Sequence, residues 1–407
     1  MPRIPCLIVG VTTCASLFAP GAASAQIFGT PPIPISVGPH GEGANGPSGH
    51  ATISGDDRKA RYVAFDSAAS NLVGGDTNGR TDVFVWSRPH GGEGLRLSRP
   101  ARPSGSLVRA SVSSSEAQGN GDSWNPSLDG SMHSRPRCVA FQSTSTNLAR
   151  GDADPVSDVF VRNFHRGRTV LISRGIGAPA QNPSIDGDCG SVAFDAGGLV
   201  FVAREGGGRP HLLGSGSNPS YARDGSAITW VQGGGIMLRA GGHTLRVADS
   251  GSDPHVSDRT SGGWAVVFQT GARLTGNDTN PGSDVYMRVI RGGRVVDTDL
   301  ISASRRGAHS LGGSNLAGGI TAYGAPRGIV TFASAQGGSD TLYYRNNHTG
   351  NIDDLAHASG GAVIFDVATS ARANFVAFSS TYSAFRFDHN GSQQDVFFKA
   401  LRDGDAL

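Results

Sequence analysis

The sequence predicts an all-β fold in which copies of one four-stranded unit close into a ring. Two observations carry this prediction: a motif recurs along the chain, and the composition is typical of strands and turns. Of the 407 residues, 60 are glycine, and the 33 acidic residues include four glutamates. Lysine occurs twice, against 33 arginines. Because Glu and Lys cover exposed helix faces whereas Asp and Gly favour turns, little solvated helix is expected.

The repeat is clearest in two segments that align without a gap. Residues 61–85 read RYVAFDSAASNLVGGDTNGRTDVFV, and residues 137–161 read RCVAFQSTSTNLARGDADPVSDVFV. Residues 264–287 keep the same order, and shorter copies fill the spaces between. Each copy contains an apolar triplet, and the seven triplets end at Phe65, Phe141, Phe194, Trp230, Phe268, Phe332 and Phe378. Variable spacing around a constant triplet indicates that insertions lie in loops.

The order of segments within a copy predicts four strands. Residues 125–175 contain NPSLDG, RCVAF, DVFVRN and TVLISRG, all short and mostly rich in β-branched or aromatic residues. Their continuous apolar runs indicate sheets buried on both faces, so the copies must stack on one another. We therefore predict a single β-propeller of seven blades over residues 51–401. A propeller of six blades with a terminal extension is the alternative, because the last two copies are degenerate.

The two chain ends predict how the ring closes. The last copy stops after DVFFKA at residues 395–400 and has no counterpart of residues 169–174. Residues 33–38 resemble residues 171–175 and can supply the missing outer strand, where Pro34 is acceptable because that strand is an edge. We expect this ring-closing strand within an N-terminal segment, residues 26–50, and a C-terminal tail at residues 402–407. An N-terminal arm outside the fold is the alternative.

Residues 1–25 predict a secretory signal peptide. Arg3 precedes a largely apolar run from Ile4 to Phe18, and the small residues Ala22 to Ala25 form a cleavage site near Ala25. No later segment approaches the length of about 18 apolar residues that suggests a transmembrane segment. The mature protein is therefore expected to be a periplasmic or secreted monomer.

Cleavage removes Cys6 and Cys14 and leaves Cys138 and Cys189 in an oxidising compartment. These two cysteines either form a disulfide or remain as small buried strand residues, and the sequence favours neither outcome. Cys14 lies where a lipoprotein signal would be cleaved, but residues 11–13 lack the usual pattern of leucine and small residues.

The motifs resemble a known repeat family. NPS-x-DG, an apolar VAF strand, an NL-x-x-GD-x-N turn and SDVFV are similar to the repeats of TolB-like propellers, bacterial relatives of WD repeats. The resemblance covers nearly the whole mature chain and implies a propeller fold. It implies no single activity, because such repeats occur in periplasmic interaction proteins, in propeller domains of peptidases and in polysaccharide-active proteins.

Three turns of the repeat are candidate sites for a hard cation such as Ca²⁺. Each turn places side-chain oxygens at alternate positions, followed by a further carboxylate: Asp76, Asn78 and Asp82; Asp152, Asp154 and Asp158; and Asp278, Asn280 and Asp284. The alternative is structural, since Asp and Asn also cap turns by accepting backbone N–H groups. The sequence requires no cofactor.

A second candidate site is one end of the central channel. If NPS begins the innermost strand of a blade, polar residues recur around that end, namely His50, Asn125, Asn182, Asn218 and Asp253. Convergent polar groups on a concave surface favour ligand binding. The alternative is that Asn or Asp before Pro starts a turn and ties neighbouring blades together.

Motifs for catalysis are absent from the sequence. Neither Gly-x-Ser-x-Gly nor His-Glu-x-x-His occurs, so no residue is assigned a catalytic role. Nucleic acid is not an expected partner, because the net charge is +2 and no basic tract contains interleaved aromatic residues. We expect an exported, non-catalytic binding or scaffold protein that recognises a protein or an extracellular glycan. The alternatives are a propeller enzyme acting on polysaccharide and a calcium-stabilised structural surface protein.

Overall fold

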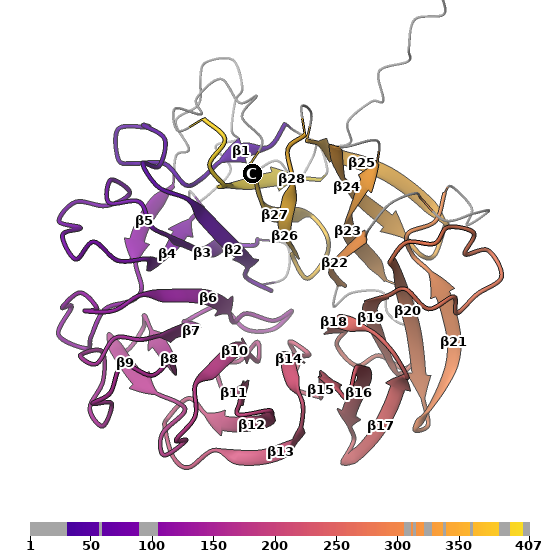
Figure 1. Ribbon diagram of the computed structural model, residues 1–407, viewed down its shortest axis with the longest axis horizontal. Helices are drawn as coiled ribbons and strands as arrows, with labels where there is room; N and C mark the ends of the chain where they lie inside the picture. Colours follow the sequence, from indigo (N-terminus) through magenta and orange to yellow (C-terminus); the bar gives the residue numbers. More distant parts are fainter. Residues whose placement is uncertain are drawn as a thin grey trace, which may run out of the picture.

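The computed structural model describes residues 31–56, 59–88, 105–304, 311, 315–320, 328–336, 339–358, 361–381 and 391–401. The predicted signal peptide and C-terminal tail lie outside these residues. The described chain forms seven four-stranded antiparallel sheets that surround a central channel as blades (Figure 1). The seven-bladed β-propeller is therefore confirmed, and the six-bladed alternative is wrong. Among the described residues there is no helix with the length and apolar character needed to cross a membrane.

In each blade the strand nearest the channel is followed by strands progressively farther out (Figure 1). Blade 1 contains β2 (Ser48–Ile53), β3 (Tyr62–Ser67), β4 (Asp82–Ser87) and β5 (Ser106–Arg109), and blade 2 contains β6 (Ser123–Leu128), β7 (Cys138–Ser143), β8 (Asp158–Asn163) and β9 (Arg168–Leu171). Blade 3 contains β10 (Ala180–Ile185), β11 (Ser191–Ala196), β12 (Leu199–Arg204) and β13 (His211–Ser215), and blade 4 contains β14 (Ser217–Tyr221), β15 (Ala227–Gln232), β16 (Gly235–Ala240) and β17 (His243–Ala248).

The remaining blades follow the same plan. Blade 5 contains β18 (Ser252–Val256), β19 (Trp264–Thr270), β20 (Asp284–Arg291) and β21 (Arg294–Leu300), and blade 6 contains β22 (Asn315–Ile320), β23 (Ile329–Gln336), β24 (Ser339–Asn346) and β25 (Asn351–His357). Blade 7 contains β26 (Ile364–Thr369), β27 (Phe375–Ser380), β28 (Asp395–Ala400) and, from the other end of the chain, β1 (Ile33–Pro34). The first propeller strand, β2, begins within the segment expected to precede the propeller.

A pair of large side chains lies at the centre of every blade. The last residue of each apolar triplet stands opposite a residue of the third strand, as Phe141 stands opposite Phe160. In six blades both partners are aromatic, with ring centroids 5.3–6.4 Å apart. In blade 4 Trp230 stands opposite Met237 instead. The triplets therefore mark the blades, because their last residue packs on the face of the sheet that meets the preceding blade.

The apolar core is divided among the interfaces between blades. Each of the seven buried clusters joins two neighbouring blades; Val83 and Val85 of blade 1, for example, pack with Phe141 and Phe160 of blade 2. The smallest cluster, between blades 3 and 4, has four buried residues, of which Trp230 is the largest. Both faces of a blade are covered by its neighbours, as the unbroken apolar runs predict.

The N-terminal strand closes the ring as predicted. Strand β1 pairs antiparallel with β28, with Ile33 opposite Phe398. The Ile35 N–H then donates to the Val396 carbonyl oxygen at 2.9 Å, and the Ser36 hydroxyl donates to the Asp395 carboxylate at 2.8 Å. Ile35 is completely buried in the cluster between blades 7 and 1. Residues 33–36 thus complete the last blade.

Truncation of this contact is expected to destabilise the whole ring. Ile35→Ala should lower the free energy of unfolding by about 2–5 kcal/mol, because it leaves a cavity where blade 7 meets blade 1. Urea unfolding followed by circular dichroism measures the change. Leu212→Ala, at a side chain that is 61% exposed on β13, is the matched control. Equal stability of the two variants would show that β1 is dispensable.

Cys138 and Cys189 form a disulfide between blades 2 and 3. Cys138 begins β7, whereas Cys189 lies in the turn between β10 and β11. Their Cα atoms are 5.8 Å apart and 51 residues separate them in sequence. The bond therefore constrains a long loop of the unfolded chain and links two adjacent blades.

Removal of the disulfide is expected to lower the stability without changing the fold. Cys138→Ala combined with Cys189→Ala should reduce the free energy of unfolding by about 2–4 kcal/mol, because the unfolded chain gains conformational freedom. The melting temperature of the wild-type protein should fall with dithiothreitol, and that of the double variant should not. A reductant effect of equal size in both proteins would contradict this assignment.

Candidate functional site

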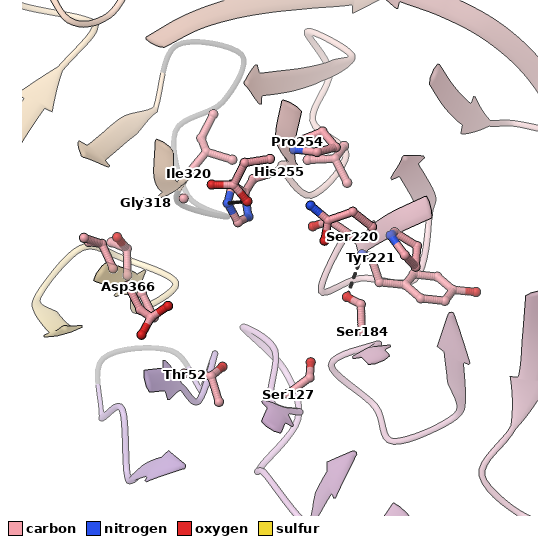
Figure 2. A pocket seen from close by; sticks show the side chains of 18 of the residues that line it. Thr52, Ser127, Ser184, Ser220, Tyr221, Pro254, His255, Gly318, Ile320 and Asp366 are labelled. Atoms are coloured by element: carbon pink, nitrogen blue, oxygen red, sulfur yellow. Dashed lines mark hydrogen bonds and ion pairs between the residues drawn. The ribbon is translucent and has the colours of Figure 1, made fainter. Parts of the chain in front are cut away.

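The central channel contains a cavity of about 580 Å³ lined by the innermost strands of all seven blades. Figure 2 shows side chains from different blades around this space, including Thr52, Ser127, Ser184, His255 and Asp366. Of the residues predicted at the channel end, four lie in the lining, namely His50, Asn125, Asn218 and Asp253. Asn182 is not part of the lining. The channel end that carries these residues is called the mouth below.

The five predicted mouth residues share one backbone conformation. All have positive φ angles, between 48° and 53°, and each lies at a β-bulge in the innermost strand of its blade. Asn, Asp and His adopt this left-handed conformation more readily than other side chains. Their recurrence is therefore explained in part by the backbone, independently of any ligand.

The bulges also tie neighbouring blades together. The N–H groups of His50, Asn125, Asn182 and Asn218 each donate to a side-chain oxygen of the preceding blade at 2.7–2.9 Å, the acceptors being Asp366, Asp66, Gln142 and Asp195 respectively. The hydrogen bonds between neighbouring blades that were predicted for the Asn-Pro positions are therefore present. In blade 4 Val231 takes the place of these acceptors, so the following bulge at Asp253 has no such side-chain acceptor.

Sequence reasoning missed three of these acceptors. Asp66, Gln142 and Asp195 each follow directly the phenylalanine that ends an apolar triplet. Their position in the repeat is constant, but their residue type changes from copy to copy. A search for polar residues directly after the triplet would have found them.

Charge at the mouth is concentrated around His50. Its Nδ1 lies 2.7 Å from the Asp66 carboxylate, and this hydrogen bond, with the nearby charge of Asp366, raises the pKa of His50 to about 9. The imidazole is therefore protonated at neutral pH.

Two further side chains line the cavity from other blades. On blade 5 Nε2 of His255 lies 3.5 Å from Asp253. On blade 7 Phe365 lines the cavity with 43% of its surface exposed.

Arg223 crosses the channel away from the bulges. Its guanidinium extends from blade 4 and donates to the carbonyl oxygens of Ile53 at 3.1 Å and Thr369 at 3.3 Å, in blades 1 and 7. Burial lowers the pKa of the Arg223 guanidinium, and the carboxylates of Asp258, Asp56 and Asp129 oppose that change. This partly buried cation lines the cavity and joins blades that are far apart in the sequence.

The three candidate metal turns lie outside the channel lining and differ from one another. In blade 1 Arg109 lies 3.0 Å from Asp76 and 3.4 Å from Asp82, and the Asn78 side chain donates to Asp82. In blade 2 carboxylate oxygens of Asp152, Asp154 and Asp158 lie within 4.8 Å of one another.

In blade 5 the Tyr286 hydroxyl donates to Asp278 at 2.6 Å, the Ser302 hydroxyl donates to Asp284 at 2.5 Å, and the Asn280 side chain donates to the Leu311 carbonyl oxygen. The three turns with one sequence pattern therefore have three different surroundings, and three carboxylates come together in blade 2.

Comparisons with known protein structures show that the fold is similar to that of other β-propellers. No protein-family model and no curated protein sequence matches the chain. An oligogalacturonate lyase in complex with manganese is similar in structure with a TM-score of 0.51 and 9% identity, over 94% of this chain and 100% of that one. The β-propeller domain of the Trilobed protease from Pyrococcus furiosus has a TM-score of 0.49 and 14% identity, over 88% and 97% of the two chains.

TolB from Acinetobacter baumannii is also similar, with a TM-score of 0.40 and 13% identity. The match covers 65% of this chain and 64% of that protein. Identities this low show the fold and no activity. The chain is a β-propeller, similar in fold to other β-propeller structures.

Proposed function

We propose that the protein is an exported, non-catalytic binding protein that holds part of an extracellular glycan or of a protein in the mouth of its channel. The observation that carries this proposal is the cavity of about 580 Å³ to which all seven blades contribute. Its volume is within the range of pockets that enclose small ligands or the end of a larger one, about 300–1,000 Å³.

The lining offers the groups that such a ligand needs. The Asp366 and Asp253 carboxylates and the Asn125 and Asn218 amides are acceptors or donors for hydroxyl and amide groups. The protonated His50 provides a positive charge beside these carboxylates. Phe365 offers an exposed aromatic surface on which a sugar ring or an aliphatic side chain can pack.

Export is supported by two independent features. The predicted signal peptide, cleaved near Ala25, directs the chain out of the cytoplasm. The disulfide between Cys138 and Cys189 suits an oxidising compartment. We accordingly propose a periplasmic or secreted monomer.

An enzyme acting on polysaccharide is the second candidate, because the oligogalacturonate lyase has a similar fold. That structure is described as a complex with manganese. Among the residues described here, the group of three carboxylates that could bind a metal, namely Asp152, Asp154 and Asp158, does not line the channel, and we therefore place binding first. Incubation with oligogalacturonate and detection of new unsaturated ends would separate the two functions.

The binding proposal predicts that side chains at the mouth determine affinity. Phe365→Ala and His255→Ala should each weaken binding about tenfold, corresponding to the loss of about 1.4 kcal/mol at a contact. Calorimetric titration with neutral and uronate-containing oligosaccharides and with acidic and basic peptides measures this. Leu212→Ala, on the outer strand of blade 3, should bind like the wild type. Absence of binding to every probe, or equal losses in all three variants, would reject the channel as the binding site.

His50 is expected to make stability depend on pH. Because its pKa rises from 6.5 to about 9 on folding, the stabilisation is complete below the unfolded pKa and is lost as the pH rises through the folded pKa. His50→Asn keeps a residue type that already occupies this conformation in blades 2 to 4. The melting temperature of this variant should fall less than that of the wild type between about pH 7 and about pH 10.

The control for the pH experiment is His243→Asn, at an exposed position at the start of β17. It should retain the wild-type pH dependence. A His50→Asn variant with the same pH dependence as the wild type would show that the His50–Asp66 pair does not stabilise the fold.

A further inference from the structure

The turn between β7 and β8 of blade 2 contains a buried carboxylate without a counter-charge of its own. Each carboxylate oxygen of Asp152 exposes less than 1 Å² and has no hydrogen-bond partner of good geometry. A buried, ionised carboxylate without a partner is costly, so this arrangement needs a compensating group.

The equivalent turn in blade 1 already contains that group. The Arg109 guanidinium lies between Asp76 at 3.0 Å and Asp82 at 3.4 Å, and its side chain is 7% exposed. The Ser111 hydroxyl donates to the other oxygen of Asp82 at 2.5 Å. Blade 1 thus shows that this turn accommodates a positive charge between its first and last carboxylates.

Blade 2 preserves the turn but lacks the arginine. The residue opposite Phe84 in blade 1 is Arg109, whereas the residue opposite the corresponding Phe160 in blade 2 is Leu171. The Ser173 hydroxyl donates to Asp158 as Ser111 does to Asp82. The hydrogen bond that orients the last carboxylate is therefore retained, and the internal cation is not.

The blade 5 turn differs from the blade 2 turn as well, and a neighbouring arginine is engaged elsewhere. Blade 5 also has a leucine, Leu300, in the place of Arg109, but its turn contains Asn280 where blade 2 has Asp154. The Tyr286 hydroxyl donates to Asp278 at 2.6 Å, whereas the matching residue of blade 2, Phe160, has no hydroxyl. Arg174 lies over the blade 2 turn but donates to the Arg150 carbonyl oxygen at 3.0 Å. Since no basic residue of the described part of the chain forms an ion pair with Asp152, a cation from solution can supply the positive charge.

We propose that the blade 2 turn binds one Ca²⁺ ion through the carboxylates of Asp152, Asp154 and Asp158. Ligand oxygens of these residues lie within 4.8 Å of one another, a spacing that one ion with oxygen ligands at about 2.3–2.6 Å can bridge. Asp154 is exposed, so water can complete the coordination. Ca²⁺ fits better than Mg²⁺, because Ca²⁺ tolerates irregular geometry and a variable number of ligands. The ion would occupy the place that Arg109 fills in blade 1.

The proposal is tested by calorimetric titration of the full chain with CaCl₂ after treatment with EDTA. The wild type should bind one Ca²⁺ per chain and gain melting temperature with added Ca²⁺. Asp152→Asn should weaken Ca²⁺ binding by about 100-fold or abolish it. Asp76→Asn, the matched change in the turn that holds Arg109, should leave Ca²⁺ binding intact.

A further variant tests the substitution of an arginine for the ion. Leu171→Arg introduces into blade 2 the side chain that blade 1 has at this position, and it should raise the melting temperature in EDTA and remove the response to Ca²⁺. The proposal is overturned if the wild type binds no Ca²⁺, or if Asp152→Asn binds it as well as the wild type. Loss of binding in Asp76→Asn, or an equal response to Mg²⁺, would also overturn the assignment of Ca²⁺ to this turn.

Discussion

Each blade of this propeller has two apolar faces, and it can cover them only with its neighbours. Pairs such as Phe141 and Phe160 pack against the preceding blade, and a buried cluster lies at every one of the seven interfaces. An open row of blades would leave one face at each end in water, so burial is complete only when blade 7 meets blade 1. The pairing of β1 with β28 therefore follows from the packing that holds every other blade.

Closure of the ring also brings the polar residues of neighbouring blades together at the mouth of the channel. Four of the bulges donate a backbone N–H to a side-chain oxygen of the preceding blade, such as Asp66 or Asp195. The backbone of the polar residues at the mouth therefore stabilises the contacts between blades. The side chains of all of them except Asn182, together with His255 and Phe365, line the cavity.

Repetition explains how much the sequence could predict. Seven apolar triplets and four residues before proline show the same positions several times, so the blades, the closing strand and most of the mouth were predictable. Arg223 was not, because its partners Ile53 and Thr369 are 170 and 146 residues away and depend on ring closure. The contrast between Arg109 and Leu171 was also hidden, since it depends on the register between the third and fourth strands.

Departures from the repeat are the features from which specific function can arise. A symmetric ring would present the same group seven times, whereas the mouth has a protonated His50 beside Asp66 on one side and Asp253 with His255 on another. A ligand at the mouth therefore meets a directional arrangement of charge, which favours one orientation over the others. The blade 2 turn also departs from the repeat: leucine replaces the arginine that contacts two carboxylates in blade 1, and both carboxylate oxygens of Asp152 lack a hydrogen-bond partner. Packing that recurs in every blade keeps the ring closed, whereas single-residue differences between the repeats give individual blades different polar and charged groups.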